Sequence, residues 1–182
     1  MLYHGPAAKY RGRELCFNAA GFVLDIADVT DKQHPKTISL ATYPQVGYTH
    51  QGWLTDDQRY FVLDDELDEG LDFTQALRAD TPGGPPPTRT RTLVFDLTDL
   101  EDPVVARAFY GPTAATDHNL YIRGRYLYQA NYLAGLRVLD IATPTQPTEV
   151  SYFDTTPASA NTPAWEGTWI RKVNQSRAGA SG

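Results

Sequence analysis

The feature that most constrains this 182-residue chain is an internal repeat. Three segments end an apolar run with an aspartate, and a proline follows each aspartate by seven residues. The aspartates are Asp28, Asp96 and Asp140, and the prolines are Pro35, Pro103 and Pro147. Twenty-two residues after each aspartate come His50, His118 and Thr162, and twenty-five after it come Trp53, Tyr121 and Trp165. Spacing kept over so many positions predicts that each copy forms the same supersecondary unit.

The period of the repeat points to strands. Arg13 and Arg125 each precede the aspartate of their copy by fifteen residues, whereas Arg59 precedes Asp96 by thirty-seven because of a 22-residue insertion. When the insertion and two extra turn residues at 55–58 of the middle copy are left out, the period is near 44 in all copies. A unit of about 40 to 45 residues with four short strands is typical of a β-propeller blade. Helical periodicity is nearly absent, and the best helical stretch, residues 73–79, ends against a proline-rich run.

One blade can be traced in the third copy. We expect strands over residues 116–123, 125–131, 135–141 and 149–154. The aspartate that ends the third strand suits a turn, because its carboxylate can accept hydrogen bonds from backbone amides ahead of it. The proline seven residues later fixes φ where the fourth strand begins.

The sequence therefore predicts an all-β chain, a β-propeller of four-stranded antiparallel blades with about three blades present in an incomplete ring. We place the blade repeats at 13–47, 48–115 with the insertion at 67–88, and 116–161, the start of a further blade at 162–170, and a disordered tail at 171–182. A closed ring typically has four to eight blades. We expect either a piece of a longer propeller or several chains that complete one, with self-association through the open strand edges.

The motifs of the chain resemble a known family. They are YRGRELCFN at 10–18, DVTDK at 28–32, GYTHQGWL at 47–54, LDDELDE at 63–69, DHNLY at 117–121 and QANY at 129–132. These strings resemble the LVIVD-repeat propellers, specifically the bacterial choice-of-anchor B proteins, over roughly residues 3–169. The resemblance implies a propeller at the cell surface or outside the cell, held by variable anchors, and it implies no reaction. The chain departs from the family pattern by starting inside the propeller and by an unrelated tail after Trp169.

Composition excludes several classes of partner. A net charge of −6 gives no electrostatic attraction to nucleic acid or to anionic lipid. The N-terminus lacks the pattern of a signal peptide, and no apolar stretch approaches the roughly 20 residues of a membrane span. The single cysteine, Cys16, lies in an apolar run, where we expect a small buried side chain.

A candidate metal site follows from the blade trace. His50 and His118 each open an innermost strand, so they should lie on one rim of the ring. The second strand of the middle copy ends on that rim with Asp64, Asp65 and Glu66. Imidazoles and carboxylates are acceptable ligands for zinc, manganese or a similar divalent cation. No cofactor is certain from the sequence, and these five residues are the candidates if a divalent metal ion is bound.

Structural alternatives exist for the same residues. Each histidine could hydrogen-bond the backbone of the neighbouring blade through one ring nitrogen. The acidic run could be a solvated strand end, since calcium needs 6 to 8 oxygens held together. The aromatic position shared by Trp53, Tyr121 and Trp165 favours packing between blades over ligand stacking.

Three functions remain open. The chain carries no nucleophile elbow, phosphate-binding glycine loop or zincin motif. We therefore favour a non-catalytic surface module that binds a protein or glycan partner through its loop-rich face. One alternative is a metal-dependent hydrolase or lactonase with an ion between His50, His118 and Asp64. Another is a truncated fragment without function.

Overall fold

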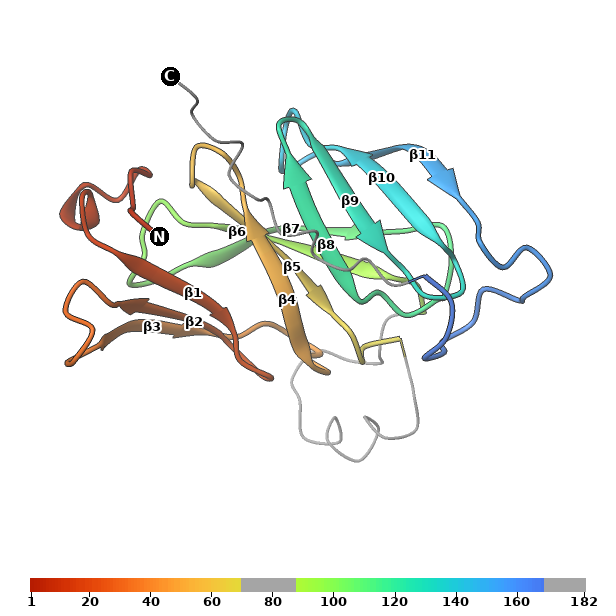
Figure 1. Cartoon of the computed structure of the whole chain (residues 1–182), viewed down its shortest axis with the longest axis horizontal. Helices are drawn as coiled ribbons and strands as arrows, with labels where there is room; N and C mark the ends of the chain where they lie inside the picture. Colours follow the sequence, from red (N-terminus) through yellow and green to blue (C-terminus); the bar gives the residue numbers. More distant parts are fainter. Residues whose placement is uncertain (70–87, 169–182) are drawn as a thin grey trace, which may run out of the picture.

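The computed structural model of the chain describes residues 1–69 and 88–168. These residues form three antiparallel sheets and one short 3₁₀ helix at Ala8–Tyr10 (Figure 1). The first sheet contains β1 (Leu15–Ala19), β2 (Leu24–Asp28) and β3 (Lys36–Ala41). The second contains β4 (Thr49–Leu54), β5 (Tyr60–Asp65), β6 (Arg91–Asp96) and β7 (Val104–Tyr110). The third contains β8 (Asn119–Arg123), β9 (Tyr126–Ala130), β10 (Leu136–Asp140) and β11 (Thr148–Phe153).

Each sheet is a meander whose strand order follows the chain. The all-β prediction is confirmed, and β8 to β11 fall within two or three residues of the strands traced from the third repeat. The 73–79 stretch, most of the 67–88 insertion and the tail at 171–182 lie outside the described residues. In the described part of the expected strand at 162–170, Thr168 forms one isolated bridge with Tyr132 and residues 162–167 form no strand.

The core occupies the two spaces between successive sheets. Leu24 and Ile26 of the first sheet belong to the same cluster as Leu63 and Phe95 of the second. A separate cluster joins the opposite face of the second sheet to the third; its members include Val62, Val94, Leu120, Leu127 and Leu139. Because both faces of the second sheet are covered, its central strands β5 and β6 are almost continuously buried rather than alternately exposed.

The repeated aspartates all make the same turn. The backbone N–H two residues ahead donates to the carboxylate, at 3.0 Å for Asp28, 2.8 Å for Asp96 and 2.9 Å for Asp140. Each carboxylate also pairs with the arginine that opens its repeat, namely Arg13, Arg59 or Arg125. Hydrogen bonds from Thr30 and Arg13 lower the pKa of Asp28 to about 2. The turn predicted from the spacing is therefore present in all three copies. In each copy an ion pair between the aspartate and an arginine accompanies the turn.

Cys16 is exposed, so the prediction that it is buried is wrong. The pairing of the repeats shows why. In the second and third sheets, the residue three positions after the arginine that opens the repeat pairs with the residue two positions before the repeated aspartate: Val62 pairs with Val94, and Tyr128 pairs with Val138. In the first sheet the residue that pairs with Ile26 is Phe17, one position later than the repeat predicts. A one-residue shift turns every side chain of a strand to the other face. Cys16 consequently lies on the face of β1 that no sheet of the described residues covers.

The turn interaction can be tested at the middle repeat. Replacing Asp96 with alanine removes the acceptor for the Thr98 N–H and the partner of Arg59, and should lower the free energy of unfolding by about 1 kcal/mol. Urea unfolding followed by tryptophan fluorescence measures the change. Asp102→Ala, at an exposed position in the next turn, is the matched control and should change stability little. Equal losses from both variants would mean that the repeated aspartate has no special role.

Candidate metal centre

Two histidines from different sheets meet where β4 and β8 contact each other. His50 is the second residue of β4, and His118 immediately precedes β8. Their rings are stacked, with centroids 4.7 Å apart and planes inclined by 23°. The two histidines hold equivalent repeat positions, and the contact between the two innermost strands brings them together.

Glu66 completes a group of three metal-binding side chains. It follows the end of β5, and its Oε2 lies 3.7 Å from Nε2 of His50 while its Oε1 lies 3.5 Å from Nε2 of His118. One ligand atom from each of the three residues lies within 4.8 Å of the others. Two ligands of a tetrahedral zinc ion, each about 2.0–2.1 Å from the metal, are about 3.4 Å apart. The carboxylate is therefore already at nearly the right separation from both imidazoles.

A hydrogen bond orients His50 for this role. Its Nδ1 lies 2.7 Å from the backbone oxygen of His118. A carbonyl oxygen can only accept, so Nδ1 carries the hydrogen, and Nε2 is the ring nitrogen that faces Glu66. This is the bond between neighbouring sheets that the structural alternative predicts for a histidine. It is also the outer contact that holds most metal-binding histidines, so it is compatible with both roles.

The environment keeps His118 neutral and desolvates Glu66. Burial, with a smaller effect of the neighbouring His50, lowers the pKa of His118 to about 4, so its ring is uncharged near pH 7. Burial raises the pKa of Glu66. The Tyr132 hydroxyl donates a 2.6 Å hydrogen bond to Glu66 Oε1 and fixes the carboxylate. Two imidazoles, that of His118 uncharged, beside a buried carboxylate form a donor set whose negative charge a cation would balance.

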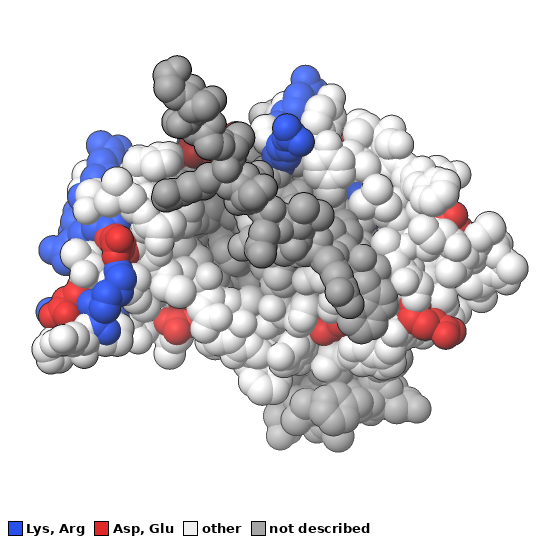
Figure 2. All heavy atoms as spheres, viewed as in Figure 1, with Lys and Arg blue, Asp and Glu red and all other residues white. Residues whose placement is uncertain are grey.

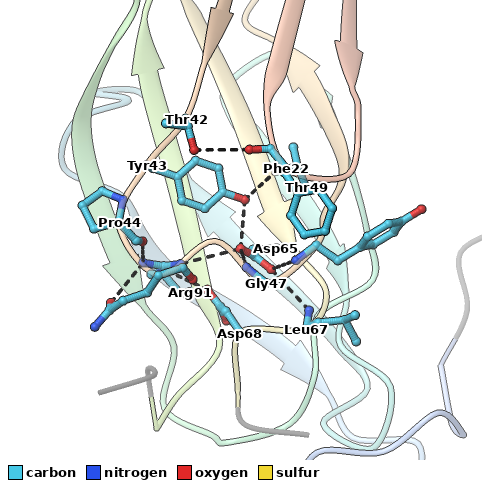
Figure 3. Close-up of polar contacts among 12 residues, drawn as sticks. Phe22, Thr42, Tyr43, Pro44, Gly47, Thr49, Asp65, Leu67, Asp68 and Arg91 are labelled. Atoms are coloured by element: carbon cyan, nitrogen blue, oxygen red, sulfur yellow. Dashed lines mark hydrogen bonds and ion pairs between the residues drawn. The ribbon is translucent and has the colours of Figure 1, made fainter. Parts of the chain in front are cut away.

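The other predicted ligands lie elsewhere. Among the described residues, the metal-binding side chains that come together are His50, Glu66 and His118, without Asp64 or Asp65. Asp65 anchors the loop before β4: it accepts hydrogen bonds from the Tyr43 hydroxyl at 2.9 Å and from the Gly47 N–H at 2.7 Å (Figure 3). Its oxygens thus have structural partners.

The acidic run is not a solvated strand end, which corrects that alternative. Its side chains are buried: Asp64, Asp65, Glu66, Asp68 and Glu69. The chain turns inward after β5, and Arg91 at the start of β6 lies beside the run, with its Nε 2.6 Å from Asp68 Oδ2. Arg91 also donates to the carbonyl oxygens of Pro44 and Gln45, both at 3.0 Å (Figure 3). A buried cation therefore compensates part of this negative charge.

Asp64 lies against a second carboxyl group. Gln129 Nε2 donates to Asp64 at 3.1 Å, and the carboxyl of Asp117 lies close enough to influence the pKa of Asp64. Both aspartates are fully buried. Burial raises the pKa of Asp64 to about 8 and raises that of Asp117 well above its usual value. At neutral pH this pair retains a proton, because ionising both carboxyls would bury two neighbouring negative charges.

Sequence reasoning missed three residues that shape this region, namely Arg91, Asp117 and Tyr132. Asp117 stands next to His118 in the motif at 117–121, and a charged arginine that opens the apolar strand 91–96 was a visible anomaly. A buried charge in such a place requires a paired partner. Tyr132 carried no distinguishing signal, because its hydroxyl reaches Glu66 across the boundary between two repeats.

Comparison with known proteins identifies one repeat. A model of the LVIVD repeat family matches residues 117–155, which span the whole third sheet and include His118. This match supports the resemblance to that repeat family over the third copy. No curated protein matches the chain. In the described part of the chain, no helix has the length and apolar character needed to cross a membrane.

The buried arginine offers a test of the acidic region. Replacing Arg91 with methionine keeps an unbranched side chain but leaves the carboxylates of Asp65 and Asp68 without their cation. Removing one partner of a buried ion pair typically costs about 3–5 kcal/mol, so we expect a loss of this size in urea unfolding. Arg89→Met, two residues away and exposed, should have little effect. An Arg91→Met protein as stable as the wild type would show that this charge is not needed.

Proposed function

We propose that the chain is part of a β-propeller whose function depends on a divalent transition-metal ion bound by His50, Glu66 and His118. The observation that carries this proposal is the orientation of His50, whose Nδ1 donates to the His118 carbonyl and so directs Nε2 toward Glu66. The propeller arrangement is supported by the 44-residue repeat and by three meander sheets packed face to face. A cell-surface location is proposed from the family resemblance.

The donor set favours particular metals. Two imidazole nitrogens with one carboxylate are the protein ligands of several catalytic zinc sites and of non-haem iron oxygenases. Calcium is disfavoured because it prefers 6 to 8 oxygen ligands. Three protein ligands leave at least one coordination position for an exogenous oxygen. The side chain of His50 is 24% exposed, so that position can be reached from solvent.

We propose that the open position binds an oxygen donor of a protein or glycan partner, such as a carboxylate or hydroxyl group. This joins the predicted non-catalytic binding module to the metal. Metal-dependent hydrolysis is the second candidate, because zinc with an open position lowers the pKa of bound water to about 7. The buried Asp64 and Asp117 carboxyls are the nearby acids for that chemistry.

Metal content is the first test. Purified protein loaded with Zn²⁺ and dialysed should retain one ion per chain, measured by elemental analysis and titration calorimetry. Glu66→Gln and the double variant His50→Ala, His118→Ala should lose the ion, because each variant removes side chains that bind it directly. Tyr132→Phe should weaken binding roughly 10- to 100-fold, as for other outer-shell partners.

Matched histidine variants complete this experiment. His4→Ala and His34→Ala change exposed histidines outside the site and should retain the ion. Circular dichroism must show that every variant keeps its β-structure. A wild-type protein that retains no stoichiometric zinc, cobalt, manganese or iron would overturn the proposal. So would equal metal loss in the His34→Ala control.

The open coordination position can be examined with cobalt. In Co²⁺-loaded protein, acetate should change the visible absorption spectrum by occupying that position, and it should do so without turnover of ester or lactone substrates. An absorption spectrum that acetate does not change would mean that the metal has no coordination position open to an external oxygen ligand. Turnover that is lost in Glu66→Gln would favour the hydrolase over the binding module.

A further inference from the structure

The inner edge of the first sheet, on strand β1, is largely open. Strand β1 pairs with β2 on one side, and the first residues of the chain hold the start of its other side, where Met1 and Leu15 exchange two hydrogen bonds of 2.8 Å. Beyond Leu15, no strand in the described part of the chain pairs with this edge at Phe17 or Ala19. In the second and third sheets β4 and β8 take the equivalent place. The first sheet is therefore one innermost strand short.

A groove runs beside the open edge. It has a volume of about 470 Å³ and is lined on one side by residues of β1 and on the other by residues of β4 and β5. Its apolar lining includes Leu15, Phe17, Trp53, Leu54 and Phe61, and exposed Cys16 lies along it. An unpaired strand edge next to an aromatic groove is a site for strand addition, in which main-chain hydrogen bonds and side-chain pockets act together.

The chain contains an innermost-strand sequence that has no sheet. Repeat spacing makes Trp165 the third member of the position occupied by Trp53 and Tyr121. The first two contact each other edge to face, with ring centroids 5.2 Å apart. Trp165 is 51% exposed, and its ring rests on Tyr132. Figure 1 shows this segment beside the third sheet, away from β1, so it does not reach the open edge of its own chain.

We propose that residues 162–166 of a second copy of this chain add to β1 as the missing strand, with Trp165 in the groove beside Trp53. The residues that lie opposite one another on neighbouring strands of the other sheets predict which residue of β1 pairs with Trp165. In the other sheets these residues form the rows Trp53–Val62–Val94 and Tyr121–Tyr128–Val138, and the corresponding row of the first sheet is Phe17–Ile26. Trp165 then pairs with Phe17, and Glu166 pairs with Cys16.

The backbone groups agree with this pairing. Leu15 directs its N–H and C=O toward Met1, so Phe17, two residues on, directs both groups toward the same edge. Trp165 opposite Phe17 can exchange both hydrogen bonds. Pro163, which has no N–H, falls opposite Ala19 and limits the pairing at one end, and Met1 limits it at the other. The added strand is therefore short and centred on Trp165.

If two copies exchange residues 162–166 with each other, the first sheet of each copy gains its fourth strand. The described residues contain eleven strands, and the added segment makes twelve, enough for three four-stranded sheets. The described part of each of the two copies then contains three sheets of four strands, the number typical of a propeller blade. A head-to-tail contact of this kind ends in a closed assembly when the rotation is right. The inference depends on the repeat and the open edge and not on the metal site.

A disulfide tests the pairing directly. Cys16 is the single native cysteine, and Glu166 opposite it would occupy a non-hydrogen-bonded pair with Cα atoms about 4.5 Å apart, within reach of a disulfide. Glu166→Cys oxidised with oxidised glutathione should run as a dimer of 20.2 kDa chains on a non-reducing gel. Mass spectrometry should identify a peptide that links Cys16 to position 166. The double variant Cys16→Ser, Glu166→Cys should remain uncrosslinked.

Light scattering supplies an independent measurement on unmodified protein. The wild type should be a dimer, Trp165→Ala should shift it toward monomer, and Tyr110→Ala, which removes a comparably exposed aromatic from β7, should not. A monomeric wild type, or larger aggregates unchanged by Trp165→Ala, would overturn the proposal. Equal crosslinking without Cys16 would also overturn it. Metal content measured on the same samples keeps this outcome separate from that of the metal site.

Discussion

The structure depends on burying both faces of the second sheet between the first and the third. Val62 and Val94 face one neighbour, while Leu63 and Phe95 face the other. Full burial of an aliphatic or aromatic side chain contributes roughly 1.5–3 kcal/mol, so these faces supply much of the driving force for packing the sheets. The same packing sets β4 against β8, and that contact brings His50 to His118. The site is thus a consequence of how the sheets pack.

The second constraint is electrostatic. Five carboxyl groups at the end of β5 and directly after it are turned into the protein, and Asp117 approaches from the next repeat. Several of these groups are compensated by different means: Asp65 accepts hydrogen bonds from backbone amides, Asp68 pairs with Arg91, and Asp64 and Asp117 together retain a proton. Glu66 has a tyrosine hydroxyl and two imidazoles. It is the member of the run whose surroundings offer nitrogen donors, and for this reason the proposed metal falls there.

Periodicity made much of the fold predictable. The strands of the third repeat and the turns at Asp28, Asp96 and Asp140 followed from spacing, because hydrogen bonds within a turn involve residues two positions apart. Burial of Cys16 was predicted wrongly, since a one-residue difference in pairing within β1 reversed its direction. The acidic run was misjudged for a similar reason. Read by itself, a run of carboxylates is expected to face water. In the structure the run is buried, and the residues that accompany it there, Arg91 and Asp117, come from positions distant in sequence.

The sequence by itself determined the repeat, the all-β class, the strands of the third copy, and the equivalence of His50 with His118. These are local or periodic properties that any copy of the unit must share. Only the tertiary structure decided that Glu66, rather than Asp64 or Asp65, joins the two histidines, and that β1 keeps an open edge beside Trp53. Both depend on where a strand ends in three dimensions and on what its neighbours cover. Linear spacing does not record either property, because side chains from different repeats meet only after the sheets have packed.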